Sequence, residues 1–362
     1  MTKKKTVGIK IRRLRIVNYK GIDELELDFP RPKMFGDPDV VVMGSRNGLG
    51  KTSVLECCAL LLIALSSREY MFELSRRGSL PIDLPEMIIR AGASIAQIEG
   101  ALDIGDMTIV LDVAIHKSGT VKIKNKPEQL LDVQQLLGKG KTDVVEHFVS
   151  TVGGMSQNPL LSEYFLYFHS YRKVQEGNPE LGMMVERENA QRRVRYRPAY
   201  GVPMSTFKLR ILRSLMSRAN LFEDLGDEQS EDVLIKLNEF VERYAGGTIQ
   251  KLRPSSDNTV DFRIHPVDGG PSFTFDGLSS GQKEIIATLF LIWDQTRDKP
   301  GVVLIDEPEL HLNPEWHRDF IKQLSKIAPD NQYIIATHSE EVFASVDEDH
   351  RFLLQNSTGG KS

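Results

Sequence analysis

The chain has 362 residues, 40% of them hydrophobic, with 46 Lys and Arg against 50 Asp and Glu. This composition excludes a disordered or fibrous chain, and the net charge of −4 excludes a globally basic nucleic-acid binder. The longest apolar run, residues 57–65, is too short to span a membrane, which takes about 20 residues. The only cysteines, Cys57 and Cys58, are adjacent and cannot build a disulfide framework. We therefore expect a cytoplasmic protein with no membrane partner.

The first third of the chain predicts strands around one helix. Alternating apolar residues indicate a hairpin over residues 9–29, with its turn at Lys20-Gly21. Four consecutive apolar residues, 40–43, are typical of a strand buried on both faces, and residues 57–65 of a buried helix. Alternation returns over 95–123 and predicts further antiparallel strands.

The rest of the chain predicts helices and then an α/β pattern. Helix and loop signals dominate from about residue 126 to 247. Strands are expected at 259–264, 302–305, 333–336 and 352–354, and helices at 279–293 and 314–327. Because buried strands flank the middle segment, we expect three parts of one α/β protein. They are an N-terminal lobe (1–125), a mostly helical insertion (126–250) and a C-terminal lobe (251–362).

A glycine-rich loop lies between the buried strand and the buried helix, which is the context that a phosphate-binding loop requires. Glycines let backbone N–H groups approach phosphate oxygens, and the helix adds its positive N-terminal end. Lys51 would reach the β- and γ-phosphates, and Thr52 would ligate Mg²⁺. The residues expected to contact the nucleotide are Ser45, Asn47, Gly48, Gly50, Lys51 and Thr52. The strict pattern has glycine in place of Ser45; the alternative is a chance glycine-rich turn, which the strand–loop–helix context disfavours.

Polar residues also follow the later buried strands. Asp306 and Glu307 end one strand, where open α/β sheets bind ligands, so Asp306 can hold Mg²⁺ while Glu307 orients or deprotonates water. An acidic turn is the alternative. Ser279 and Gln282 form a capping box that exposes a helix N-terminus, either as a second anion site or only as a helix start. His338 ends the next strand, where it can hydrogen-bond the γ-phosphate.

The order of these motifs resembles that of ABC-type ATPases. The opening "IRRLRIVNYKGIDELELDF" resembles the RecF/SMC branch, and "DEPELHLNPEWHRDF" with "ATHSEEVF" resembles the ATPases of overcoming-lysogenization-defect nucleases and related anti-phage systems. The resemblance covers residues 7–125 and 255–355 and implies a two-lobed P-loop ATPase head. Besides Ser45, Ser280 and Asn313 depart from the pattern of transporter cassettes, and both suit this branch.

The resemblance also implies a head-to-tail dimer that holds two ATP molecules with Mg²⁺. One subunit would supply Lys51, Thr52, Asp306, Glu307 and His338; the other would supply Ser279, Ser280 and Gly281. The family also uses a loop glutamine that senses Mg²⁺ and the γ-phosphate. Gln175 in "SYRKVQEGNP" resembles it, and Gln97 is a second candidate.

A basic cluster occupies the middle segment: Arg192, Arg193, Arg195 and Arg197, with Tyr196 and Tyr200. Interleaved arginines and aromatics suit contact with DNA or a protein partner. A solvated face balanced by Glu186 and Glu188 is an equal alternative.

We therefore expect an ATPase whose closure serves DNA surveillance or anti-phage defence through a separate effector, a nuclease or toxin. Only 24 residues follow His338, too few for the nuclease domain that the resembled family carries there. The alternatives are a nucleotide-sensing scaffold with little turnover and a DNA-repair ATPase. Lys51 and Ser279 are 228 residues apart, which disfavours a transporter cassette, and the missing heptads disfavour an SMC-type arm.

Overall fold

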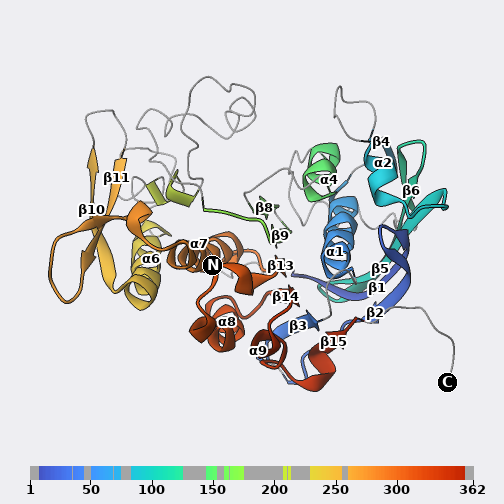
Figure 1. Ribbon diagram of the computed structural model, residues 1–362. Helices are drawn as coiled ribbons and strands as arrows, with labels where there is room; N and C mark the ends of the chain where they lie inside the picture. The colour runs from blue at the N-terminus through green and yellow to red at the C-terminus, as the bar shows by residue number, and fades with distance from the viewer. Residues whose placement is uncertain are drawn as a thin grey trace, which may run out of the picture. The chain divides into compact units, whose positions relative to one another are not determined.

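The computed structural model describes residues 8–34, 36–44, 50–67, 69–74, 83–124, 144–152, 159–162, 164–174, 207–209, 211–212, 229–254 and 260–354. The chain divides into two compact units, one of residues 1–172 and 295–362 and the other of residues 173–294 (Figure 1). The sequence predicts boundaries after residues 125 and 250, whereas the compact units change at residues 172/173 and 294/295. The predicted insertion contains β8 (Leu160–Leu161) and β9 (Phe165–Phe168), which belong to the first unit.

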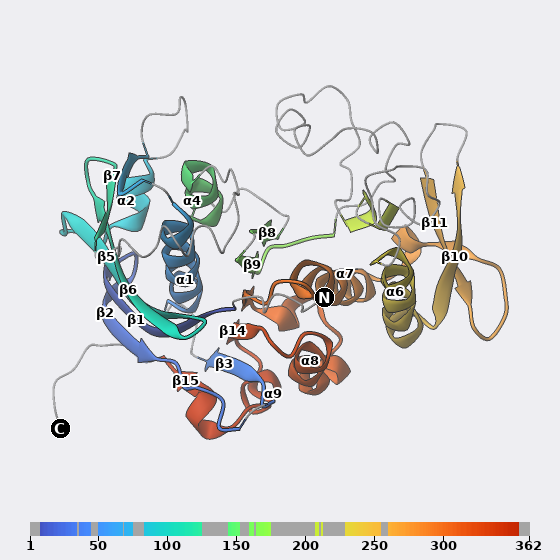
Figure 2. The same ribbon diagram turned by 180° about the vertical axis from the view of Figure 1, so that it is seen from behind.

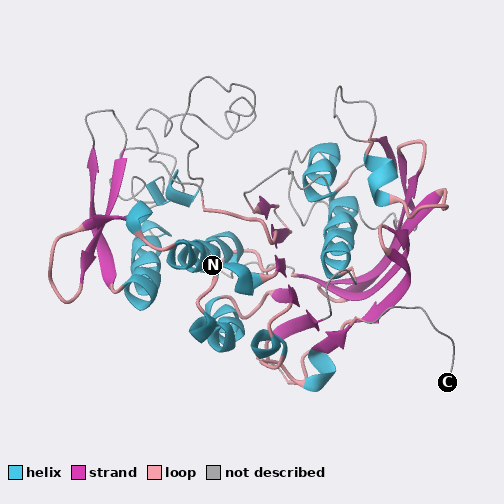
Figure 3. Ribbon diagram, viewed as in Figure 1, coloured by secondary structure: helices cyan, strands magenta, loops and turns pink. Residues whose placement is uncertain are grey.

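An antiparallel sheet forms one layer of the first unit (Figure 3). The alternating sequence pattern produces it, because every second side chain of a strand faces the core. Glycines at positive φ, such as Gly105 and Gly119, make its tight turns. Its strands in spatial order are β2 (Ile22–Asp28), β1 (Ile9–Tyr19), β5 (Ile95–Ile104), β6 (Met107–His116), β7 (Thr120–Lys124) and β4 (Met71–Glu73). The predicted strands over 9–29 and 95–123 are confirmed.

A mostly parallel sheet forms the second layer. Its strands in spatial order are β15 (Arg351–Leu353), β3 (Asp39–Gly44), β14 (Gln332–Thr337), β13 (Val302–Asp306), β9 (Phe165–Phe168) and β8 (Leu160–Leu161). All neighbours run parallel except β8, which pairs antiparallel with β9. The residues of β3, β13, β14 and β9 are all buried, as expected for strands of a parallel sheet that is covered on both faces.

Helix α1 (Lys51–Ser66) packs against both sheets, and its residues from Val54 to Leu65 are buried all round. Such a helix belongs in a core rather than on a surface. Helix α4 (Val144–Val152) packs against α1, and the short α2 (Leu84–Ile88) packs against α4. Figures 1 and 2 show α8 (Pro314–Ile327) and α9 (Glu340–Phe343) on the opposite side of the parallel sheet. Of the helices that the structure describes, none combines the length and apolar character that a membrane crossing needs.

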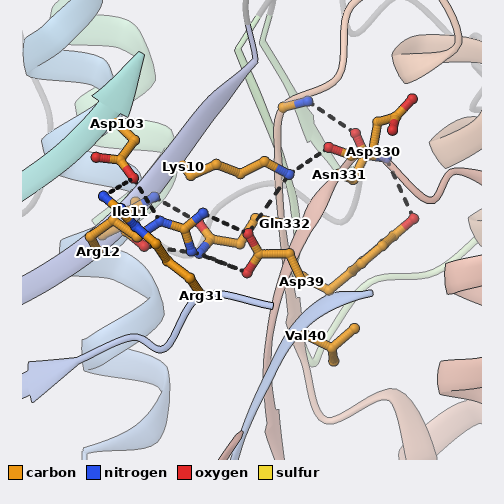
Figure 4. Close-up of polar contacts among 12 residues, drawn as sticks. Lys10, Ile11, Arg12, Arg31, Asp39, Val40, Asp103, Asp330, Asn331 and Gln332 are labelled. Atoms are coloured by element: carbon orange, nitrogen blue, oxygen red, sulfur yellow. Dashed lines mark hydrogen bonds and ion pairs between the residues drawn. The ribbon is translucent and has the colours of Figure 1, made fainter. Parts of the chain in front are cut away.

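A buried polar network joins the two sheets of the first unit (Figure 4). The Gln332 side chain on β14 completes a pair of hydrogen bonds with the backbone of Ile11 on β1, at 2.7 and 2.8 Å. Arg12 bonds Asp39 at 2.9 Å and Asp103 at 3.0 Å. Lys10 donates to the Asp330 carbonyl at 2.5 Å, and burial lowers the pKa of its ammonium to about 8. The network thus ties β1 to the amino ends of β3 and β14.

The second unit combines helices with a small antiparallel sheet. Its elements are α6 (Gln229–Ala245), β10 (Gly247–Pro254), β11 (Val260–Pro266), β12 (Phe273–Thr274), the 3₁₀ turn η4 (Phe275–Gly277) and α7 (Ser280–Thr296), whose last two residues belong to the first unit. In its core the Phe207 ring packs at a tilt against Phe275 and in a T-shaped arrangement against Phe290. Lys208 is buried beside them and donates to Asp276 at 2.6 Å. The predicted helix at 279–293 and the predicted strand at 259–264 are confirmed.

Candidate functional site: a nucleotide edge of the parallel sheet

The parallel register brings the carboxyl ends of β3, β14, β13 and β9 to one edge of the sheet. Thr337 pairs with Gly44, Asp306 with Ala336, and Ile305 with Phe168, so the residues that follow these strands leave the sheet side by side. This is the edge at which open α/β sheets bind ligands, and the sequence predicts reactive side chains there. A side chain at Gly44 would collide with the Phe343 ring, at 2.7 Å, which is why glycine ends β3.

The loop after β3 leads into α1 through Gly50. Gly50 is the N-cap of α1 with φ +88°, a backbone conformation that favours glycine, and a Cβ there would make a tight 3.0 Å contact with Ile22. Lys51 and Thr52 are the first two residues of the helix. Of the other predicted loop residues, Ser45, Asn47 and Gly48 lie outside the described residues.

Thr52 and Asp306 form a pair of oxygen ligands. Thr52 Oγ1 donates to Asp306 Oδ2 at 2.9 Å, while the buried Asp306 Oδ1 has no hydrogen-bond partner among the described residues. Burial, followed by the nearby Glu307 charge, raises the pKa of Asp306 to about 7, against the opposing Thr52 hydrogen bond. A hydroxyl and a carboxylate with a spare buried oxygen fit Mg²⁺, which takes one or two protein ligands together with substrate phosphates. In the described part of the chain, no group of three or more His, Cys, Asp or Glu could hold a metal ion.

Glu307 turns the chain sharply at the end of β13. Its backbone is left-handed, with φ 46° and ψ 61°, which costs a non-glycine residue roughly 1–2 kcal/mol. Glu307 N donates to the Ala336 carbonyl at 2.8 Å, and Pro308 then starts the 3₁₀ turn η5 (Pro308–His311). The turn directs the Glu307 carboxylate toward His338, whose Nε2 lies 3.1 Å from Glu307 Oε1.

His338 also meets Lys51. Lys51 Nζ lies 2.8 Å from His338 Nε2 and 3.3 Å from Nδ1. One nitrogen cannot accept from Lys51 and donate to Glu307 at the same time, so the proton position on His338 selects its partner. Burial lowers the pKa of Lys51, and the Glu307 and Asp306 carboxylates oppose that shift. His338 and Glu307 remain partly exposed, with side-chain exposures of 34% and 21%, so a substrate can reach them.

The end of β9 contributes residues that the sequence analysis missed. His169 follows the strand and is 2% exposed; burial, then the Arg172 charge, lowers its pKa to about 4. Arg172 donates 2.8 Å hydrogen bonds to the carbonyls of both His169 and Asp306. The signal was the apolar run 165–168 followed by a histidine, the same pattern as at the other strand ends. Gln175, the predicted sensor, lies outside the described residues, and Gln97 lies on β5 of the antiparallel sheet, paired with Val17 and Ala114.

The predicted capping box is present in the second unit. Ser279 N donates to Gln282 Oε1 at 3.0 Å, and Gln282 N to Ser279 Oγ at 3.3 Å. Gln282 Nε2 also donates to the Tyr244 carbonyl at 2.9 Å, which ties the start of α7 to the end of α6. Ser279 and Ser280 are exposed at this helix start, beside Gly281. The arginine cluster of Arg192, Arg193, Arg195 and Arg197 lies outside the described residues, so its role stays a prediction.

Comparison with known proteins identifies related families. A family model described as "AAA domain, putative AbiEii toxin, Type IV TA system" matches residues 161–344, from β8 to α9. The chain is 38% identical over 92 residues to "Retron Ec83 probable ATPase" of Escherichia coli, covering 22% of this chain and 16% of that protein. It is 22% identical over 353 residues to "Septu protein PtuA" of Bacillus mycoides (strain KBAB4), covering 96% of this chain and 40% of that protein.

The chain therefore spans less than half the length of these curated relatives. Among solved structures, an SMC head bound to the C-winged helix domain of ScpA aligns with a TM-score of 0.51 and 13% identity, covering 93% of this chain and 92% of that chain. This likeness concerns the fold alone. The expected resemblance to ABC-type ATPases of bacterial defence systems and the expected α/β ATPase-head fold are confirmed.

Proposed function

The chain belongs to the AAA-domain family whose model matches residues 161–344, and from this membership we propose that it binds and hydrolyses ATP with Mg²⁺ at the edge of the parallel sheet. The observation that carries the proposal is the meeting of two contact sets at that edge. One set is Thr52 with Asp306, and the other is Lys51 with His338 and Glu307.

Each side chain has a chemical role in this reaction. The Lys51 ammonium and the N-terminal end of α1 bind phosphate oxygens. Thr52 and Asp306 would hold Mg²⁺, which neutralises charge on the phosphates when bound. Glu307 accepts a proton from the attacking water, and His338 with a proton on Nε2 donates to the γ-phosphate. Phosphoryl transfer depends on positioning and electrostatics, and these residues provide the types of group that the reaction requires.

The Glu307→Gln variant tests the proposal. The amide keeps the size of the side chain but cannot accept the proton, so turnover should fall by about 10²–10⁴-fold while ATP binding persists. Phosphate release and nucleotide-binding assays measure the two quantities separately. Glu315→Gln, an exposed residue of α8, is the matched control. Wild-type turnover in Glu307→Gln would remove Glu307 from the mechanism, and tight ATP binding by a wild type without single-turnover hydrolysis would favour a nucleotide sensor.

The proposal extends to a defence role in the cytoplasm. The relatives named for retron and Septu systems support it, as does the family description with its toxin system. ATP would close a head-to-tail dimer of this chain, and closure would control a separate nuclease or toxin whose affinity differs between open and closed forms.

The same variant tests the extension. ATP-bound Glu307→Gln should accumulate as a dimer in size-exclusion chromatography, and a genetically adjacent chain should co-purify with an affinity that differs from that of the wild type. Equal affinities in both states would contradict coupling, and plasmid cleavage by the purified chain alone would contradict a separate effector.

A further inference from the structure

Glu309 links the segment after β13 to the segment that carries His338. It lies in η5, two residues after Glu307, and its carboxylate accepts from three groups at the end of β14. Glu309 Oε1 accepts from His338 N at 2.5 Å and from Ser339 N at 3.2 Å. Glu309 Oε2 accepts from Thr337 Oγ1 at 2.7 Å.

The geometry gives these contacts a specific consequence. The two backbone N–H groups belong to His338 and its successor, so they set where the His338 Cα lies and how its side chain leaves the backbone. Thr337, 1% exposed, braces the turn from within, because its hydroxyl also accepts from Ser339 N at 3.0 Å. Hydrogen bonds to a carboxylate are about twice as strong as neutral ones, so this is a firm support for an otherwise exposed residue.

We propose that Glu309 is a positioning residue for the ATPase reaction, acting through His338. By bridging two neighbouring strand ends, it keeps His338 Nε2 within reach of Lys51 and Glu307. This inference rests on the proposed ATP hydrolysis, and it adds a residue that does not itself touch the nucleotide.

Amide hydrogen exchange of the nucleotide-free protein tests the positioning directly and needs no activity. Glu309→Ala should speed exchange in peptides that cover residues 337–343 and leave the β3 and β13 peptides unchanged. Unchanged exchange at 337–343 would overturn the proposal whether or not the chain hydrolyses ATP. Absent turnover in the wild type would instead count against the proposed function, so the two failures are distinguishable.

A double-mutant cycle tests the catalytic consequence. Misplacing a catalytic group by about 1 Å costs about 10²-fold, so Glu309→Ala should lower kcat by about that factor with little change in ATP affinity. In a His338→Ala background, Glu309→Ala should lower kcat by less than about twofold further, because the group that it positions is gone. The same factor in both backgrounds would mean that Glu309 does not act through His338.

Two conservative variants separate hydrogen-bond reach from charge and cover the case in which Glu309→Ala fails to fold. Glu309→Gln keeps the length of the side chain and an oxygen for the two N–H groups, so it should keep kcat within about tenfold of the wild type. Glu309→Asp keeps the charge but is one methylene shorter, so it should resemble Glu309→Ala. The reverse order would overturn positioning by hydrogen bonds. Glu315→Gln should leave exchange and turnover unchanged.

Discussion

Asp306 carries a carboxylate that the fold keeps almost out of water, with 1% exposure. Desolvation is the main cause that raises its pKa to about 7, from 3.8. Above that pH the buried carboxylate is ionised and poorly hydrated. The hydrogen bond from Thr52 and the charge of Arg172 stabilise this ionised form. The pKa is raised nonetheless, so ionisation of this carboxylate costs stability, and the proposed role as a Mg²⁺ ligand requires the ionised form.

The Asp306→Asn variant should therefore stabilise the nucleotide-free protein at pH 8. The folded state holds the Asp306 proton more tightly than the unfolded state, so this group favours folding below pH 3.8 and loses that contribution as pH rises through about 7. Removing the charge should raise the free energy of unfolding by roughly 2–4 kcal/mol at pH 8 and by little at pH 4. Denaturant titrations at both pH values measure this.

Magnesium and a non-hydrolysable ATP analogue provide the control for that experiment. They should raise the melting temperature of the wild type more than that of Asp306→Asn, because only the carboxylate gains a cation. A variant that is less stable than the wild type at pH 8 would show that Asp306 contributes to the fold instead of straining it.

At the scale of elements, the sequence was most informative where a pattern was local. Residues 40–43, 302–305 and 333–336 are apolar runs flanked by glycine or polar residues, and each became a buried strand. The run 165–168 is equally apolar, but four residues cannot be distinguished from a helix fragment by periodicity. Its place beside β13, more than 130 residues away along the chain, depends on packing that no local signal carries.

In the candidate site, too, the sequence predicted residues with a local signal but not those placed by long-range packing. Lys51, Thr52, Asp306, Glu307 and His338 follow recognisable strand ends, so residue type and position predicted them. Glu309 and Arg172 contact the backbone at other strand ends, and His169 accepts from Arg172. Because those contacts depend on the order of strands in the sheet, the linear sequence could not reveal them.

A substitution at Lys10 would test the polar network that joins the two sheets (Figure 4). The pKa of Lys10 is lowered from 10.5 to about 8, with burial as the main cause and Asp39 opposing it. Between those pH values the folded state has lost the proton that the unfolded state keeps, so stability should rise as pH rises from 8 to 10. Lys10→Met should abolish that rise, as urea titrations at pH 7, 8.5 and 10 would measure.

The control for this experiment is Lys33→Met, which removes an exposed lysine whose pKa is raised by its hydrogen bond to Asp349. That variant should keep the rise in stability between pH 8 and 10. A Lys10→Met protein with the same pH profile as the wild type would mean that the Lys10 ammonium stays hydrated in this network.

At the scale of the whole molecule, two of the described helix starts are proposed to bind phosphate. Lys51 and Thr52 open α1 in the first unit, and Ser279 with Gln282 caps α7 in the second. A phosphate loop that already surrounds its nucleotide has little use for a second helix start on the same chain. The proposed dimer gives the second start a function, because it would complete the site of the partner copy.

Mixing two inactive variants tests this arrangement. Lys51→Ala and Ser280→Arg should each abolish turnover alone, the first by removing the phosphate ligand and the second by filling the exposed helix start. In a head-to-tail dimer of the two, one composite site has an intact Lys51 and an intact Ser280. Equal mixing should restore up to about a quarter of wild-type turnover, because half of the dimers are mixed and each has one working site of two.

The matched control is a mixture of Lys51→Ala with Glu307→Gln. Both of these residues lie on the same edge of the parallel sheet, where Lys51 and Glu307 each contact His338. Every composite site in that mixture then has one defect, whichever subunit supplies the helix start, so no activity should return. Native mass spectrometry must first demonstrate subunit exchange in both mixtures. Rescue of the first mixture alone supports a shared site. If subunit exchange is demonstrated and neither mixture recovers turnover, there are two explanations. Either each chain completes its own site, or one intact site cannot turn over while the other is blocked.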